Sequence, residues 1–298
     1  MAATSSSHPF FTTQPGGLRE SRSWSPVAPH FAGKLATGTI EAARKMAAMA
    51  LELKPLVSTT SRVLDAGAGS GAITETVRAL DPEVPIVAVD KVPGMVEFLA
   101  RKNISNVTTG LADVTAMVGQ DRGGLVPEAG FTHAFAALVV QFCGEHQTDM
   151  LTELFRAVEP GGVAGASITR DITVREPWHL ACERLDPESY RRFETHDAPP
   201  VWMSADEVDA GMRAVGFRDT RSATLPIEFT WDSAEDYIKF WFEGGHPGLR
   251  KEMRGWEEGL GRDPDEVRLE VEKAGREQFD GAPRLGCNVD IVVGRRPV

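Results

Sequence analysis

Residues 63–71, which read VLDAGAGSG, constrain the fold of this chain more than any other segment. A short apolar run leads into three closely spaced glycines, and a helical pattern follows. Gly67 permits a tight turn, Gly69 lets a ligand approach the backbone without a Cβ in the way, and Gly71 allows close packing at the helix start. The segment therefore predicts a strand, a glycine turn and a helix that together face a bound ligand.

Strands and helices alternate along the middle of the chain. The apolar runs predict strands at 62–66, 86–90, 131–138 and 163–169. Between them, apolar residues at helical spacing predict two helices, through Val92, Met95, Val96 and Leu99 and through Leu151, Leu154, Phe155 and Val158. We expect the second helix to stop at the turn formed by residues 160–162, Pro-Gly-Gly. This alternation predicts a doubly wound α/β fold, Rossmann-like, with a mostly parallel sheet covered on both faces.

The pattern also predicts how the chain divides. Residues 1–26 are rich in Ser, Thr, Pro and Gly and read as a flexible tail, and residues 27–298 read as one domain. Within that domain we expect a cofactor-binding core at 27–170, helical cap insertions at 171–203 and 231–285, and a final strand at 286–298. Between the insertions, Ser204 and Glu207 form a capping box that opens a helix.

Charge and cysteine spacing restrict the possible partners. Asp plus Glu number 43 against 32 Lys plus Arg, which gives a net charge of −11. A surface this acidic repels phosphate backbones, so we expect a small-molecule partner and neither nucleic acid nor a membrane. The three cysteines form no C-x-x-C pair, which argues against a zinc site, and we expect no metal. Without a signal-peptide pattern, the expected location is cytoplasmic. The oligomeric state stays open.

The acidic residues around the turn distinguish between kinds of cofactor. The glycines run G-x-G-x-G, whereas a dinucleotide fingerprint is G-x-G-x-x-G, and Ala72 satisfies only its loose form. Asp65 precedes the turn and would repel a pyrophosphate, but it suits an ammonium group. Asp90 ends the second predicted strand, where a carboxylate can accept hydrogen bonds from both hydroxyls of a ribose. These residues favour a nucleoside cofactor that carries an ammonium group.

At these residues the sequence resembles the class I S-adenosylmethionine-dependent methyltransferases, most closely the small-molecule enzymes of quinone and fungal secondary metabolism. VLDAGAGSG is similar to their first motif, IVAVD at 86–90 to the second, and LADV at 111–114 to the third, where an acid meets the adenine amino group. Residues 136–138 occupy the place of the fourth, but this chain has Ala and Phe where an acid or Asn is common. The resemblance implies S-adenosyl-L-methionine as cofactor and S-adenosyl-L-homocysteine as product. The implied cofactor-binding residues are Asp65, Ala66, Gly67, Gly69, Asp90, Lys91, Met95, Asp113, Val114 and Ala137.

Other residues carry weaker hypotheses. His146 follows the fourth strand, where an imidazole could take a proton from an acceptor, although an exposed residue at a helix start is the favoured interpretation. His133 lies within a strand and reads as a core histidine. The candidate substrate-binding residues are aromatic: Phe31, Trp178, Trp202 and Trp241. Phe31 belongs to an N-terminal aromatic segment that in the resembling enzymes often covers the methionine end of the cofactor; its alternative is an aromatic staple for the first long helix. The three tryptophans would form a lid over the substrate, and the alternative is that they form the core of small helical layers.

The resemblance implies an enzyme that moves the sulfonium methyl group to O, N or S of a small molecule by in-line displacement. Two alternatives stay open. The first is a methyltransferase-fold protein that binds the cofactor without methylating, in a regulatory or pericyclic role, and the second is an NAD-dependent reductase.

Overall fold

The computed structural model describes residues 35–119, 124–170, 176–188, 204–242, 262–278 and 284–298. The chain packs into two compact units. We call the first the sheet unit; its described residues are 35–119, 124–170, 204–229 and 286–298. The second is the helical unit, whose described residues are 176–188, 230–242, 262–278 and 284–285.

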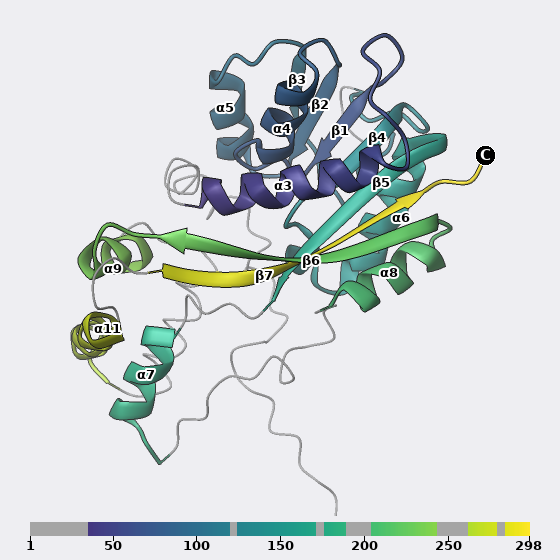
Figure 1. The fold of residues 1–298 in the computed structure, drawn as a ribbon. Coiled ribbons are helices and arrows are strands. Elements are labelled where there is room, and N and C mark those ends of the chain that lie inside the picture. Colours follow the sequence, from purple (N-terminus) through teal and green to yellow (C-terminus); the bar gives the residue numbers. More distant parts are fainter. Residues whose placement is uncertain (1–34, 120–123, 171–175, 189–203, 243–261, 279–283) are drawn as a thin grey trace, which may run out of the picture. The chain divides into compact units, whose positions relative to one another are not determined.

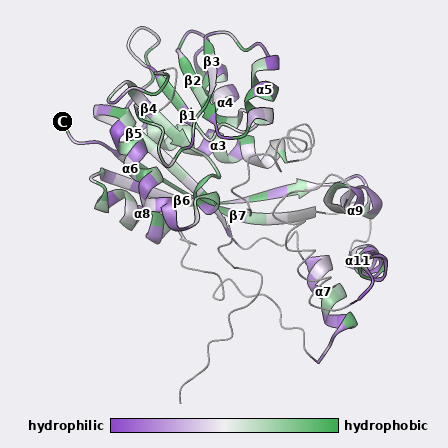
Figure 2. Cartoon of the chain, turned by 180° about the vertical axis from the view of Figure 1, so that it is seen from behind, coloured by the Kyte–Doolittle hydropathy of each residue, from purple (hydrophilic) through white to green (hydrophobic). Residues whose placement is uncertain are grey.

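A single seven-stranded sheet runs in the order β3-β2-β1-β4-β5-β7-β6 (Figure 1). The strands are β1 (Val63–Ala66), β2 (Ile86–Asp90), β3 (Val107–Leu111), β4 (Phe131–Ala136), β5 (Val158–Arg170), β6 (Arg218–Thr230) and β7 (Arg284–Arg295). β3, β2, β1, β4 and β5 pair in parallel, and β7 pairs antiparallel with β5. β1 and β4 are buried throughout, and β1 and β2 read as hydrophobic strands in Figure 2. The mostly parallel, Rossmann-like sheet confirms the predicted fold class.

Helices cover both faces of this sheet, as buried parallel strands require. The helices are α3 (Ala36–Leu51), α4 (Ala72–Leu80), α5 (Pro93–Arg101), α6 (Gln147–Ala157) and α8 (Ala205–Ala214). α6 and α8 pack their apolar residues against one face, on a core that includes Leu64, Val89 and Ala134. On the other face, Leu99 of α5 packs against Ala88 of β2. The two helices with a predicted apolar period therefore bury residues of that period, Met95 and Leu99 in α5 and Leu151 and Leu154 in α6.

The turn at 160–162 differs from its prediction. α6 already ends at Ala157, and the Pro-Gly-Gly residues lie inside β5. There the register shifts: Phe131 of β4 pairs with Val158, and His133 pairs with Val163. The extra residues form a bulge in β5, and Gly161 adopts a φ of +76°, which favours glycine. β4 is likewise shorter than predicted, because it ends at Ala136.

Asp290 joins the last strand to the rest of the sheet unit. Its carboxylate is only 2% exposed and accepts hydrogen bonds from Arg170 Nε at 2.8 Å, Ala205 N at 3.0 Å and Thr224 Oγ1 at 2.5 Å. These partners come from β5, α8 and β6. A buried charge needs such partners, so Asp290 couples four elements at one point.

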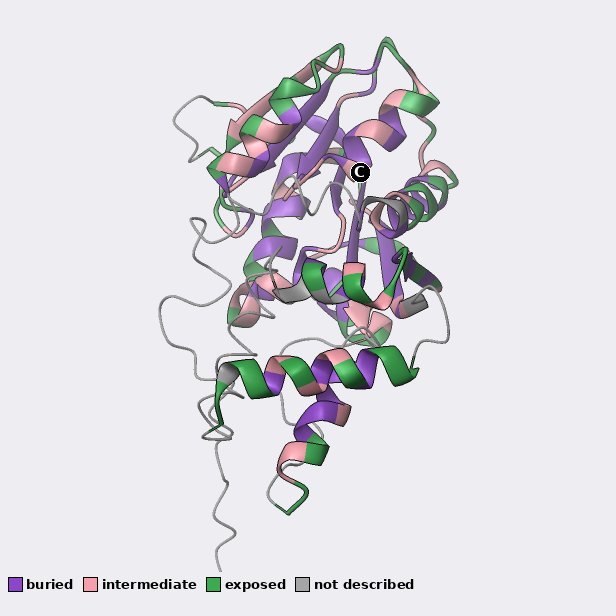
Figure 3. Cartoon of the chain, turned by 90° about the vertical axis from the view of Figure 1, so that its left-hand side faces the viewer, coloured by how far each residue is buried: buried purple, intermediate pink, exposed green. Residues whose placement is uncertain are grey.

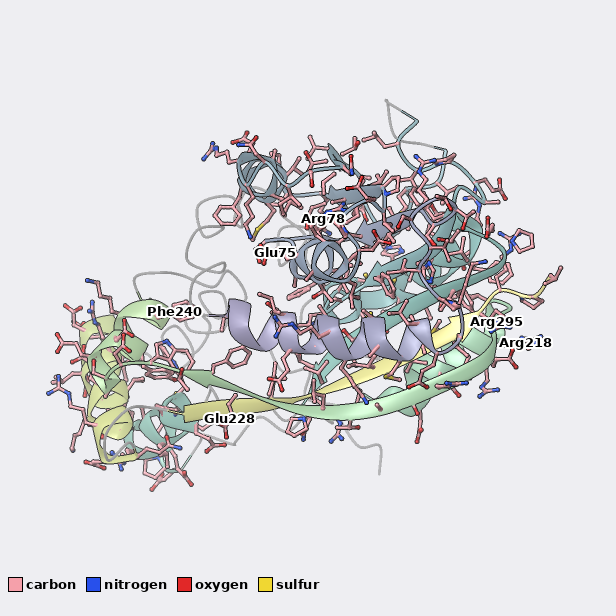
Figure 4. All side chains as sticks on the ribbon, turned by 45° about the horizontal axis from the view of Figure 1, so that its top comes forward. Glu75, Arg78, Arg218, Glu228, Phe240 and Arg295 are labelled. Atoms are coloured by element: carbon pink, nitrogen blue, oxygen red, sulfur yellow. The ribbon has the colours of Figure 1, made fainter. Side chains whose placement is uncertain are left out.

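Two arginines lie near the ends of the outer strands, and a side-chain cap begins the neighbouring helix α8. Arg218 at the start of β6 and Arg295 at the end of β7 lie at one end of the sheet, and Arg295 donates to the carbonyl of Leu53 (Figure 4). α8 begins after Ser204, whose Oγ accepts a hydrogen bond from Glu207 N. The predicted cap is thus confirmed.

The described part of the helical unit contains α7 (Glu176–Leu185), α9 (Ala234–Phe242) and α11 (Pro264–Gln278). α11 buries a stripe that consists of Val267, Val271 and Ala274, and the positions between them are exposed or partly exposed (Figure 3). Trp231 meets Tyr237 edge to face, with ring centroids 5.2 Å apart. These contacts give the unit an apolar interior of its own.

Ion pairs lie on the surface of this unit. Arg184 of α7 binds Glu270 at 3.2 Å and Glu277 at 2.6 Å, both on α11.

Among the helices that the structure describes, none is long and apolar enough to cross a membrane.

Candidate functional site

The glycine turn lies where β1 ends and α4 begins. The backbone N–H groups of Gly67 and Ala68 donate to the carbonyl of Val89, at 2.8 and 2.9 Å, which fixes the turn against β2. Gly67 has a φ of +72°, and a Cβ there would lie 2.7 Å from Val139 Cγ2. At Gly69 an added Cβ would meet nothing within 4 Å. The turn is therefore closed toward Val139 and open at Gly69, as the approach of a ligand requires.

Lys102 holds the outer side of the turn. Its Nζ donates to the carbonyl of Ser70 at 2.7 Å and to Glu75 Oε1 at 2.5 Å. Glu75 belongs to the first turn of α4 (Figure 4). Lys102 follows α5, so this side chain connects the two helices that flank the turn.

Asp65 lies beneath the turn. Its side chain is 2% exposed, and its Oδ2 accepts hydrogen bonds from Thr74 N at 3.0 Å and Thr74 Oγ1 at 2.6 Å. Burial raises the pKa of this carboxyl to about 6; the Thr74 hydrogen bonds oppose the rise and the Asp90 charge adds to it. The carboxylate thus anchors the start of α4 rather than lining the turn's surface.

Asp90 ends β2 beside the turn and is half-buried. Its Oδ2 accepts from Gly69 N and its Oδ1 accepts from Val92 N, both at 2.9 Å. Burial raises the pKa of this carboxyl, and the hydrogen bonds from Val92 and Gly69 act in the opposite direction. Each carboxylate oxygen has a second lone pair, so Asp90 can accept further hydrogen bonds from ligand hydroxyls.

Asp113 lies in the loop that follows β3, the neighbour of β2. The side chain is exposed, and its Oδ1 accepts from Thr115 N at 3.0 Å and from Thr115 Oγ1 at 2.8 Å. The loop is held from below by Glu153 of α6, whose Oε2 accepts from Val118 N at 2.5 Å. Val114 is buried in the core. The loop therefore presents one acid on a fixed backbone.

The loop after β4 faces the same turn. Leu138 adopts a left-handed φ of +57°, and its N–H donates to Ser167 Oγ at 2.8 Å. Its carbonyl accepts from Gln141 Nε2 at 3.0 Å. Ala137 is partly exposed. This segment crosses from β4 to α6 through two short 3-10 helices, η3 (Val140–Phe142) and η4 (Gly144–His146). Val139 packs on Gly67, so the segment forms a wall beside the turn.

The remaining cofactor candidates lie close by in the chain. Ala66 is buried at the end of β1, Lys91 is partly exposed after β2, and Met95 is 4% exposed in α5. The structure thus brings the candidate cofactor residues to the carboxyl edge of the sheet. A nucleoside cofactor fits this arrangement, because the turn is open at Gly69 and acids follow two adjacent strands. Their ligand contacts stay a prediction.

The other candidates are not brought to the turn by any described contact. The His146 side chain is 43% exposed, and its Nδ1 lies 2.8 Å from Asp149 Oδ2. Trp178 is 1% exposed inside the helical unit. Phe31, Trp202 and the side chain of Trp241 lie outside the described residues. His133 is a core histidine as predicted: Nε2 lies 2.9 Å from the carbonyl of Lys54, and burial lowers the pKa of the ring.

Sequence reasoning missed the residues that support the site. Thr74, Leu138 and Gln141 carry no pattern that would have identified them. The sequence pattern could have identified Glu153, because this residue falls on the buried face of α6 with Met150 and Ala157. A carboxylate on an apolar helical face indicates a buried polar partner.

Comparisons with known proteins agree with this geometry. Residues 63–162 match the family model described as a methyltransferase domain. Trans-aconitate 2-methyltransferase from Methylobacterium nodulans is 31% identical over 159 residues, which cover 52% of this chain and 57% of that protein. The chain thus matches a little over half the length of that curated relative.

Solved structures show the same fold. The [4+2]-cyclase SpnF superposes with a TM-score of 0.50 and 16% identity over 97% of this chain and 98% of its own. A protein assigned as a type II methyltransferase from Anaeromyxobacter dehalogenans gives a TM-score of 0.50 and 18% identity, covering 84% of this chain and 97% of its own. At these identities the likeness concerns the fold alone.

Proposed function

We propose that the chain is a class I S-adenosylmethionine-dependent methyltransferase and that it transfers a methyl group to O, N or S of a small-molecule acceptor; the match of residues 63–162 to a methyltransferase domain supports this. The observation that carries the proposal is the open glycine turn, whose Gly69 N–H is held by Asp90 at the end of the next strand. When bound, S-adenosylmethionine supplies a methyl group activated by its positively charged sulfur.

Different residues of the sheet unit would bind different parts of the cofactor. Asp90 would accept hydrogen bonds from the ribose hydroxyls while it keeps Gly69 in place. Asp113 would accept from the adenine amino group. Asp65 and Lys102 hold the two ends of the turn, so the backbone is preorganised before the ligand arrives. Such positioning can supply on the order of 7–11 kcal/mol of barrier reduction at best in a displacement.

A small-molecule acceptor is supported by two observations. The net charge of −11 disfavours nucleic acid and anionic lipid. The relative from Methylobacterium nodulans is named for trans-aconitate, a small organic acid. We therefore propose an acceptor of that size and class.

The decisive experiment has two stages. Titration calorimetry of the purified chain with S-adenosylhomocysteine should show binding, and an absence of heat and of any thermal shift at millimolar ligand would refute the proposal. Incubation with S-adenosylmethionine and trans-aconitate, alongside a panel of other small organic acids, should then release S-adenosylhomocysteine.

The same experiment separates the alternatives. Binding of S-adenosylhomocysteine without methyl transfer to any acceptor would favour a protein that uses the cofactor without methylating. Binding of a nicotinamide cofactor in place of S-adenosylhomocysteine would favour a reductase.

A further inference from the structure

Gln141 carries a buried oxygen that lacks a protein partner. Its Oε1 is one of a few buried side-chain atoms in the described residues without a hydrogen bond; others belong to Thr76, Arg78, Thr220 and Arg295. Gln141 alone among them lies in the loop that follows β4. An unsatisfied buried carbonyl loses a substantial part of its hydration, so it calls for a specific explanation.

The orientation of this amide is set by its neighbour. Gln141 Nε2 donates to the carbonyl of Leu138 at 3.0 Å. A carbonyl only accepts hydrogen bonds, so the amide group cannot be turned the other way round without bringing two oxygens together. Oε1 is therefore the free end, and it can only accept.

The loop that holds Gln141 is pinned beside the glycine turn. Leu138 is a non-glycine residue with a φ of +57°, a conformation that costs energy and persists where the surroundings enforce it. Ser167 Oγ enforces it by accepting from Leu138 N at 2.8 Å. The next residue, Val139, packs on Gly67. Gln141 thus belongs to the segment that borders the proposed cofactor site.

The chemistry of the site indicates which ligand group meets this oxygen. Asp90 and Asp113 are placed for the ribose and adenine. Asp65, the acid that precedes the turn, is buried beneath it and accepts from Thr74. The α-ammonium group of the methyl donor carries three N–H donors, and a neutral amide oxygen can accept from one of them. We propose that Gln141 Oε1 accepts a hydrogen bond from this ammonium group, an inference that rests on the proposed function.

The test compares two ligands that differ in the amino-acid portion. S-adenosylhomocysteine carries the ammonium group, and 5′-methylthioadenosine lacks the whole amino-acid part. Gln141→Met removes the accepting oxygen. Gln141→Glu also loses the donation to Leu138, but it restores accepting oxygens. We expect Gln141→Met to bind S-adenosylhomocysteine about 10- to 100-fold more weakly, the range for a hydrogen bond to a charged group. Gln141→Glu should bind it nearly as well as the wild type, and 5′-methylthioadenosine affinity should not change in either variant.

Gln147 offers a matched control. It is a buried amide near the same loop, and its Nε2 donates to the carbonyl of Val140 at 3.3 Å. Gln147→Met should alter thermal stability without changing the ratio of the two ligand affinities. Circular dichroism verifies that each variant is folded.

The other outcomes are equally informative. If the wild type does not bind S-adenosylhomocysteine, the proposed function fails. If the wild type binds and Gln141→Met leaves its affinity unchanged, the inference alone fails. An equal loss for Gln141→Met and Gln141→Glu would overturn it too, because the hydrogen bond to Leu138 would then be the cause.

Discussion

The acids around the candidate site in the sheet unit differ from the ion pair that joins α7 and α11 in the helical unit. In the sheet unit, Asp65, Asp90 and Glu153 each accept a hydrogen bond from a backbone N–H in or near the segments that form the candidate site. In the helical unit, the described pair of Arg184 and Glu270 lies on the surface. Acids that bond backbone N–H groups fix the shape of a binding site, whereas exposed pairs contribute little. We therefore expect cofactor binding to depend on the sheet unit and to be insensitive to the helical unit.

The largest expected effect is a loss of stability in a variant of the helical unit. Trp178 is 1% exposed in α7, so Trp178→Ala should lower the free energy of unfolding by about 3–5 kcal/mol. Thermal and chemical denaturation measure the loss. S-adenosylhomocysteine affinity, measured by calorimetry at a temperature where the variant is folded, should change less than threefold. If stability held and acceptor turnover fell instead, Trp178 would line a substrate site.

The second prediction concerns Asp65 and pH. Its folded pKa of about 6 exceeds the ordinary value of 3.8 for an aspartate, so the folded state binds the proton more tightly. The contribution of this group to stability is therefore fully present below pH 4 and is lost as the pH rises through 6, by about 3 kcal/mol.

Asp65→Asn isolates that contribution. The amide oxygen can accept from Thr74 N and Oγ1 as Oδ2 does, and the variant has no charge to bury. Relative to the wild type, its free energy of unfolding should rise by about 3 kcal/mol between pH 4 and pH 7. A constant difference across urea denaturation curves in this range would show that Asp65 keeps an ordinary pKa.

The third prediction concerns Asp90, which lies beside the glycine turn, and its contribution to cofactor affinity. Asp90→Asn removes the charge and one of the two acceptors that hold Gly69 and Val92, so S-adenosylhomocysteine should bind about 1.5–3 kcal/mol more weakly. Asp81→Asn is the control, because Asp81 caps the far end of α4 and bonds Ser58 Oγ at 2.6 Å. Unchanged affinity in a folded Asp90→Asn variant would place the ribose elsewhere.

These residues also show how far the sequence alone could reach. The turn at 67–71 and Asp90 were predictable, because a strand, its turn and the next helix are contiguous and the end of a short buried strand is visible in the sequence. The side of β1 on which the Asp65 side chain lies was not predictable. Both faces of β1 are buried, so alternation along the strand does not distinguish a ligand-facing position from one beneath the turn.

Register and long-range contacts explain the other differences. The Pro-Gly-Gly residues at 160–162 look like a helix stop, but their place in a bulge depends on how β5 pairs with β4. Leu138 takes its left-handed conformation from a hydrogen bond to Ser167, far along the chain. Such features depend on partners that no local pattern identifies.

The smallest expected effect concerns His146, at the start of α6. Its side chain is 43% exposed and bonds Asp149, and exposed pairs of this kind contribute about 0–1 kcal/mol. We expect His146→Ala to leave the unfolding free energy and S-adenosylhomocysteine affinity nearly unchanged.

The same variant also tests whether the reaction needs a base. The rate at which S-adenosylhomocysteine is formed with the acceptor that the panel identifies should stay within about threefold of the wild-type rate, since proximity can suffice for an acceptor that is already deprotonated. A loss of about 100-fold with unchanged binding would instead make His146 the proton acceptor. Asp149→Asn should then reproduce part of that loss, because Asp149 orients the ring, whereas a merely exposed pair would leave both variants active.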